Sequence, residues 1–245
     1  MLLLSIDTST TVCSVALHRA DGDSLQAELL GCFELFTERT SSAMLTTLMR
    51  DVVRYAGFQL ADLDAVVVAK GPGSYTGLRI GTSTAKGLCF ALDKPLLAVN
   101  TLQAMAEQVR SFLAMPPAGS PDRPPSLLFC PMIDARRMEV YCALYDAQGM
   151  EHKPTAAEII DENSFADWLR DHTLVFFGDG ADKCRTVLGQ HPNAVFLDEM
   201  IRPSSRTIGQ LAVERFRAGQ FEDVAGFEPF YLKEFMVTKP KKAAF

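Results

Sequence analysis

Short apolar segments with the length and alternation of strands recur along the first half of the chain. They are expected as strands at residues 2–6, 12–17, near 25–33, at 65–69 and at 96–99. The first two are joined by the hydroxyl-rich turn Thr8-Ser9-Thr10, and Asp7 closes the first strand. This pattern predicts a β-hairpin with a polar tip.

Segments whose apolar residues recur at helical spacing lie between or after these strands. Helices are expected from about 40–42 to Gly57, at 78–92, and from 101 to about 113. The first has an unusually wide apolar stripe, made of Met44, Leu45, Leu48, Met49, Val52 and Val53. A helix that covers one sheet face needs a narrower apolar stripe than this. Either the additional apolar side chains contact another subunit, or the helix is deeply buried.

The second half of the chain opens like the first. A shift of 127 residues places Ile6-Asp7 on Ile133-Asp134 and Gly22 on Gly149. We interpret this as a duplicated β-hairpin with an aspartate at the end of each first strand. Further elements are expected as a helix near 163–170, a strand at 174–177 and a helix at about 204–217. The order of strands and helices predicts an α/β protein.

A proline-rich run divides the two halves. Residues 115–125 include five prolines and predict a linker or surface loop. We therefore expect a first lobe over residues 1–114, a second over 115–225, and a tail over 226–245 that returns to the first lobe.

The net charge of −6 changes the expectations about partners. Because neutralisation of phosphates supplies most non-specific affinity for nucleic acid, an acidic chain is not expected to hold RNA by itself. Three lysines near the C-terminus, Lys239, Lys241 and Lys242, are interpreted as a solvated tail.

Targeting and redox signals are weak. No apolar run approaches the roughly 20 residues that span a membrane, and no basic residue precedes Asp7, so a cytoplasmic protein is expected. The six cysteines include no CxxC pair and are interpreted as reduced thiols of the core.

The glycine-rich loop 71–77 lies between a predicted strand and a predicted helix, which is a natural anion site. It matches neither GxxxxGK[ST] nor GxGxxG. A tight structural turn that brings the helix close to the sheet is therefore an equal alternative.

The aspartate turns are the other candidates for phosphate chemistry. Asp7 with the hydroxyls of Thr8 and Thr10 could hold a magnesium-bound phosphate, although such residues also form ordinary turns. The equivalent turn after Asp134 carries two arginines, which weakens a catalytic interpretation. The segment 178–180 (Gly178-Asp179-Gly180) could let an adenosine approach the backbone, or could be a plain turn.

Metal and nucleophile motifs are missing from the sequence. None of the four histidines has a histidine partner three or four residues away, and GxSxG does not occur. No metal site and no catalytic residue is predicted.

Three motifs together closely resemble the bacterial TsaB (YeaZ) family over nearly the whole chain. They are IDTST at 6–10, KGPGSYTGLRIG at 70–81 and IDARRMEVY at 133–141. The resemblance implies two duplicated actin-like, ribonuclease-H-like lobes with mixed sheets flanked by helices. It also implies a non-catalytic subunit that supports the transferase TsaD in the synthesis of threonylcarbamoyladenosine beside the tRNA anticodon. The metal-binding HxxxH pair of TsaD has no counterpart in residues 38–44.

The same resemblance implies partners and a surface for them. We expect a homodimer when the chain is alone, a heterodimer with TsaD, contact with TsaE, TsaC as a further candidate partner, and tRNA only through the complex. The expected contact residues are Met44, Leu45, Leu48, Met49, Thr82 and Lys86. No cofactor of its own is expected, and ATP or ADP could bind within the complex at Asp7, Thr8, Thr10, Asp134, Gly178 and Gly180.

Two other classes of function compete with this one. An independent actin-like ATPase or small-molecule kinase would use Asp7 and Asp134. A peptidase follows only from the old glycoprotease label of the family, and no metal ligand or nucleophile motif favours it.

Overall fold

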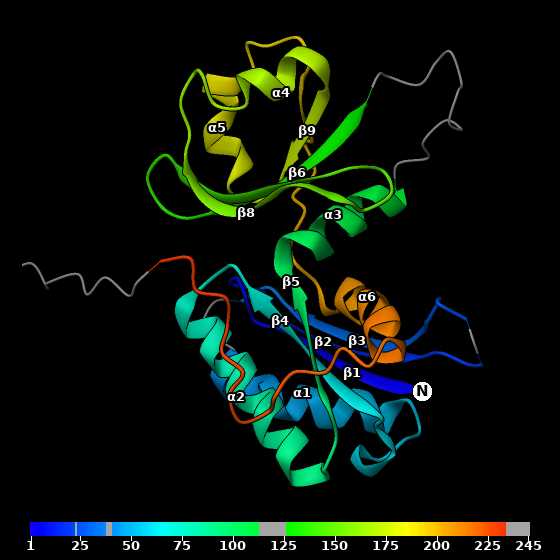
Figure 1. Cartoon of the computed structure of the whole chain (residues 1–245). Coiled ribbons are helices and arrows are strands. Elements are labelled where there is room, and N and C mark those ends of the chain that lie inside the picture. The colour runs from blue at the N-terminus through cyan, green and yellow to red at the C-terminus, as the bar shows by residue number, and fades with distance from the viewer. Residues whose placement is uncertain (23, 38–40, 113–125, 234–245) are drawn as a thin grey trace, which may run out of the picture.

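The computed structural model describes residues 1–22, 24–37, 41–112 and 126–233, which form two five-stranded mixed sheets (Figure 1). The first sheet contains β1 (Leu2–Asp7), β2 (Cys13–Arg19), β3 (Glu28–Leu35), β4 (Ala65–Gly71) and β5 (Leu96–Asn100). The second contains β6 (Leu127–Asp134), β7 (Glu139–Tyr145), β8 (Glu151–Ile159), β9 (Thr173–Phe177) and β10 (Ala194–Phe196).

The two sheets share one topology. Their orders are β3-β2-β1-β4-β5 and β8-β7-β6-β9-β10, antiparallel on one side of the central strand and parallel on the other. Strand β6 therefore occupies the place of β1, and Asp134 ends it as Asp7 ends β1. The predicted duplication is confirmed.

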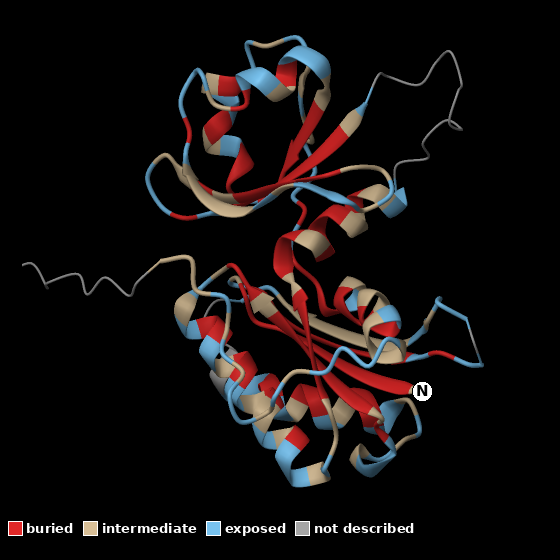
Figure 2. Ribbon diagram, viewed as in Figure 1, coloured by how far each residue is buried: buried red, intermediate tan, exposed pale blue. Residues whose placement is uncertain are grey.

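Helices cover the outer face of each sheet. On the first sheet these are α1 (Ser41–Tyr55) and α2 (Tyr75–Leu92), and on the second α4 (Ala166–Asp171) and α5 (Ala181–Leu188). Side chains alternate between the two faces along β1, so Leu2, Leu4 and Ile6 all point to α1 and α2. They form part of the core between these helices and the first sheet. Figure 2 shows that the central strands of both sheets are buried.

The inner faces of the sheets are covered by exchanged helices. Helix α3 (Thr101–Phe112) follows the last strand of the first sheet, but its Leu102, Met105 and Val109 pack on the second sheet. Helix α6 (Ser205–Arg217) follows the last strand of the second sheet, but its Ile208 and Val213 pack on the first. The helices also contact each other between the lobes (Figure 1).

This exchange corrects the assignment of residues 115–225 to the second lobe. Because the inner face of the first sheet needs an apolar cover, α6 belongs to the core of the first lobe although its sequence follows the second. The predicted boundary at 114/115 and the proline-rich run lie outside the described residues and stay predictions.

The predicted strands and helices are present, with ends moved by one to three residues. Four elements had no sequence prediction, namely β8, α5, the three-residue β10 and a short 3-10 helix at Leu60–Asp62. Within the described part of the chain, no helix is long and apolar enough to cross a membrane.

The segment after α6 returns across both lobes. Glu222 donates from its backbone N–H to the carbonyl of Leu96 (2.9 Å), and Phe230 does the same to Lys70 (2.7 Å). Lys233 then donates to the carbonyl of Ala135 in the second lobe (3.1 Å). The returning part of the predicted tail is thus seen up to residue 233, and residues 234–245, with the three tail lysines, lie outside the described residues.

Gly209 of α6 lies against a buried side chain of the first sheet, and its replacement by Ala should destabilise the fold. A Cβ there would be 2.2 Å from Nδ1 of His18 and 2.6 Å from Oγ of Ser5. Overpacking of this kind costs about 1–3 kcal/mol, which exceeds the gain of at most about 1 kcal/mol in helix propensity. The free energy of unfolding in urea would measure the loss.

Gly87 in α2 is the matched control, because a Cβ there would meet nothing within 4 Å. Gly87→Ala should raise the free energy of unfolding by about 0.5–1 kcal/mol. Equal effects of the two substitutions would contradict the close packing of α6 on His18.

Candidate functional site

The β1–β2 turn is packed into the start of α2. Thr8 donates from its hydroxyl to the carbonyl of Gly77 (2.7 Å), and Ser74 donates from its backbone N–H to the carbonyl of Ser9 (2.6 Å). Thr8 and Ser9 are buried, whereas Thr10 is half-buried and accepts from the backbone of Val12. The hydroxyl turn is therefore a structural contact within the first lobe.

The glycines of loop 71–77 make this contact sterically feasible. A Cβ on Gly73 would lie 2.1 Å from the carbonyl oxygen of Ser9, and one on Gly77 would lie 2.0 Å from that of Thr8. The N–H groups of Ser74 and Gly77 are already bonded, to Ser9 and to the Ser74 hydroxyl. Of the two sequence interpretations of this loop, the contacts favour the tight structural turn.

Asp7 is a buried carboxyl group of which one oxygen is hydrogen-bonded. Its Oδ1 accepts from the backbone of Ser9 (2.8 Å), and its Oδ2 has no partner among the described residues. Burial raises the pKa of Asp7 from 3.8 to about 6, the hydrogen bonds of Ser9 oppose this, and the charge of Glu34 adds to it.

A buried imidazole lies on the same inner face of the first sheet. His18 is 2% exposed, and burial lowers its pKa from 6.5 to about 4 although a hydrogen bond with the backbone of Arg206 opposes the shift. The charged forms of Asp7 and His18 are thus both disfavoured under α6.

The second aspartate turn is occupied by cations of the chain itself. Asp134 forms an ion pair with Lys183 and accepts from the backbone of Arg136 (2.9 Å). Lys183 also donates to the carbonyl of Glu139 (2.7 Å), and Lys233 pairs with the carboxylate of the same Glu139. The carboxylate that would hold a metal-bound phosphate is therefore already neutralised.

Gly178 and Gly180 serve the packing of the β9–α5 turn on β6. A Cβ on Gly178 would lie 2.3 Å from the carbonyl of Met132, and one on Gly180 would lie 3.0 Å from the backbone nitrogen of Asp134. Between them, Asp179 accepts from that same nitrogen (2.9 Å). Burial and the nearby charge of Asp134 raise the pKa of Asp179.

The structure thus brings the predicted nucleotide residues into three turns, one in the first lobe and two neighbouring turns in the second, and each group is bonded within its own lobe. This arrangement does not fit a metal-bound nucleotide phosphate, because the carboxylates and hydroxyls that would hold it are buried or paired. Across residues 1–112 and 126–233, apart from 23 and 38–40, no group of three or more acidic, histidine or cysteine side chains could hold a metal ion. Residues 38–40, compared above with an HxxxH pair, are outside the described part.

The predicted partner residues need a correction. Leu45, Leu48 and Met49 belong to the core between α1, α2 and the first sheet. Thr82 is 4% exposed, and Lys86 donates to the carbonyls of Ala225 and Phe227. Burial of Leu45, Leu48 and Met49 explains most of the wide apolar stripe of α1 without a partner.

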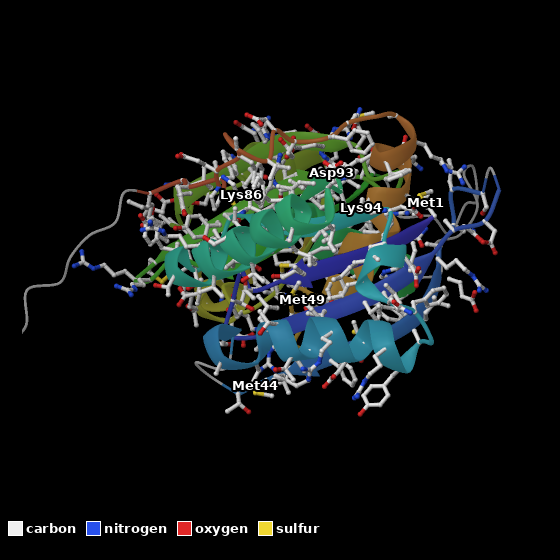
Figure 3. All side chains as sticks on the ribbon, turned by 90° about the horizontal axis from the view of Figure 1, so that it is seen from below. Met1, Met44, Met49, Lys86, Asp93 and Lys94 are labelled. Atoms are coloured by element: carbon white, nitrogen blue, oxygen red, sulfur yellow. The ribbon has the colours of Figure 1, made fainter. Side chains whose placement is uncertain are left out.

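The outer surface of α1 and α2 nevertheless exposes apolar side chains. Figure 3 looks onto these helices and shows Met44 at the outer edge of α1, with Met49 directed toward the sheet. Met44 is 39% exposed, and Phe90 of α2 is 86% exposed. Phe90 was not predicted as a partner residue. The only signal for it in the sequence is its position on the side of α2 opposite the buried residues.

Comparison with known proteins connects this arrangement to one group of relatives. A family model described as "TsaD: tRNA N6-adenosine threonylcarbamoyltransferase" matches residues 26–200. The chain is 29% identical to the tRNA threonylcarbamoyladenosine biosynthesis protein TsaB of Escherichia coli (strain K12) over 95% of both chains. It is 33% identical to the TsaB of Bacillus subtilis (strain 168), over 73% of this chain and 71% of that one.

Solved structures show the same fold. YeaZ from Pseudomonas aeruginosa superposes with a TM-score of 0.72 and 27% identity, over 94% of this chain and 99% of that one. A second structure, described as an uncharacterized protein with similarity to peptidase YEAZ from the same organism, gives a TM-score of 0.74 at 27% identity, over 95% and 99% of the two chains. With the duplicated sheets, this confirms the predicted α/β class of two actin-like lobes.

Replacement of Asp7 by Asn should stabilise the fold at pH 7. Folding raises the pKa of Asp7 from 3.8 to about 6. Its carboxyl group therefore contributes its full stability below pH 3.8, and this contribution is lost as the pH rises through 6. The difference corresponds to about 3 kcal/mol at pH 7, of which Asn recovers a part, because its amide oxygen still accepts from Ser9 while its NH2 group takes the buried place of Oδ2. Urea unfolding at pH 7 would measure the gain, with Asp198→Asn, at a 91% exposed side chain, as control.

The same variant should be more sensitive to acid than the original chain. His18 contributes stability above pH 6.5 that is lost as the pH falls to 4, and Asp7 opposes this loss over much of the same range. Without Asp7, the free energy of unfolding should fall more steeply between pH 7 and pH 5. An Asp7→Asn chain that is less stable at pH 7 would show that the carboxylate is compensated in the folded state.

Proposed function

The chain belongs to the TsaB (YeaZ) family, and we propose that it acts in the synthesis of threonylcarbamoyladenosine in tRNA as a non-catalytic subunit. The observation that carries the proposal is the contrast between its two kinds of surface. The aspartate turns are filled by atoms of the chain itself, whereas the outer face of α1 and α2 exposes Phe90 to 86%. A subunit that assembles without reacting needs the second feature and not the first.

The proposed partner is a transferase of the TsaD type, and a second copy of the chain takes its place when the transferase is absent. TsaE, and TsaC as supplier of the threonylcarbamoyl-adenylate, complete the proposed cytoplasmic system. We propose no cofactor for the chain itself; ATP or ADP would bind within the complex. In this proposal the chain positions the transferase for its tRNA.

The proposed interface is the exposed face of α1 and α2. Along α2 the exposed positions Ser83, Gly87 and Phe90 follow helical spacing, so a large ring stands beside two small residues. Small residues let a second helix approach closely, and the ring can insert between helices. Burial of one such aromatic side chain stabilises an interface by about 1.5–3 kcal/mol.

Substitution of Glu for both Met44 and Phe90 should abolish association, because two charges would be placed in a desolvated apolar contact. Size-exclusion chromatography with light scattering would measure the mass of the chain alone and mixed with the TsaD of the same organism. We expect a homodimer that converts to a heterodimer for the original chain, and a monomer for the variant.

Met150→Glu is the control, because Met150 is 65% exposed on the β7–β8 turn of the second lobe. It should associate like the original chain. Loss of association in this control as well, or a monomer that is indifferent to TsaD before any substitution, would refute the proposed interface.

The double variant Asp7→Asn/Asp134→Asn separates a subunit from an enzyme. In a reaction reconstituted with TsaC, TsaD and TsaE, omission of the chain should abolish tRNA modification, and the variant should restore it to within about tenfold of the original rate. Loss of a general acid or base costs about 10²- to 10⁴-fold. ATP turnover by the chain alone that disappears in the variant would favour an independent actin-like ATPase or kinase instead.

A further inference from the structure

The β6–β7 turn exposes two arginines in an unusual backbone conformation. Arg136 and Arg137 are consecutive, both exposed, and have φ angles of 71° and 50°. Glycine or asparagine ordinarily occupies such left-handed positions, because a Cβ is strained there. A short hairpin turn favours positive φ angles at its central residues, and arginines in place of glycine keep a strain there that glycine would relieve.

The protein does not use these two side chains for its own stability. Over the residues that the structure describes, neither arginine takes part in an ion pair. The nearby carboxylates are already neutralised by lysines, Asp134 by Lys183 and Glu139 by Lys233. Two guanidinium groups therefore face solvent without a compensating charge.

The returning C-terminal segment connects Arg79 of the first lobe to the same turn through a series of contacts. The ring of Tyr231 lies 4.7 Å from that of Tyr75, over which the guanidinium of Arg79 lies at 5.5 Å. Two residues later, Lys233 is bonded to the β6–β7 turn, and two residues span at most about 7 Å. We call Arg79, Arg136, Arg137, Tyr231 and Lys233 the junction patch, because it joins the lobes.

The chemistry of the junction patch fits a polyanion. The chain carries a net charge of −6, so an extended polyanion is repelled by most of its surface and is directed to the arginines of this patch, since Lys233 is already paired with Glu139. Arginine forks match phosphate oxygens, and aromatic rings beside cations are typical of surfaces that bind single-stranded RNA. We infer that the junction patch contacts the phosphate backbone of RNA.

This inference rests on the proposed function and goes beyond it. The subunit would touch tRNA directly, and the complex would hold its substrate from two chains. The phosphate contacts position the RNA without reading its sequence.

Arg136→Gly/Arg137→Gly tests the inference sharply, because glycine relieves the left-handed strain and removes both charges. The variant should unfold at the same urea concentration as the original chain or at a higher one. Anisotropy of a labelled unmodified tRNA transcript should show half-saturation of the original chain between about 10⁻⁶ and 10⁻⁴ M in 50 mM salt. The variant should bind at least about tenfold more weakly, and its slope of log affinity against log salt should be smaller by about 1.4–1.8.

The charge-matched control is Arg170→Gln/Arg185→Gln, since both arginines are exposed on the same lobe and paired with aspartates. It should bind RNA like the original chain, and Arg79→Gln should weaken binding. No saturable binding in 50 mM salt, or equal losses in the variant and the control, would overturn the inference.

Two further results separate this inference from the proposed function. A variant that binds tRNA normally but no longer associates with TsaD would identify the junction patch as a contact for an acidic protein and overturn the RNA assignment. A chain that binds tRNA through these arginines but never associates with TsaD would support the junction patch and refute the proposed interface.

Discussion

The exchange of α3 and α6 between the two sheets is the constraint on which the rest of the structure depends. Each sheet has an apolar inner face, and the helix that covers it comes from the other half of the chain. Neither sheet can bury its inner face without a helix from the other half of the chain, so the two lobes depend on each other. The returning segment strengthens the connection, because it pairs with β5 and β4 before it reaches the second lobe.

A second contact fills the first aspartate turn with atoms of the chain itself. Backbone of Thr8 and Ser9 fills the space that the glycines of loop 71–77 leave open. In the second lobe, Lys183 pairs with Asp134 and Lys233 pairs with Glu139. Side chains typical of phosphate chemistry thus serve packing and internal charge balance.

Two outward-facing surfaces carry the proposed function. The outer helices of the first lobe present an apolar face that suits another helical surface, and the junction between the lobes collects cations on an acidic protein. Helix α2 carries both Phe90 and Arg79, but Arg136 and Arg137 lie on the β6–β7 turn, so replacing these two arginines leaves the apolar face unchanged. A subunit that joins a transferase to its tRNA would need both.

The sequence by itself determined the strands, the long helices and the duplicated hairpins, because periodicity depends on residues close in the chain. It did not reveal β10, which is too short to show alternation. The tertiary structure decided that Leu45, Leu48 and Met49 are core residues, since their burial depends on α2 and the sheet. It also decided what fills the glycine loop, because Thr8 and Gly77, which meet there, are 69 positions apart and no local pattern records such a contact.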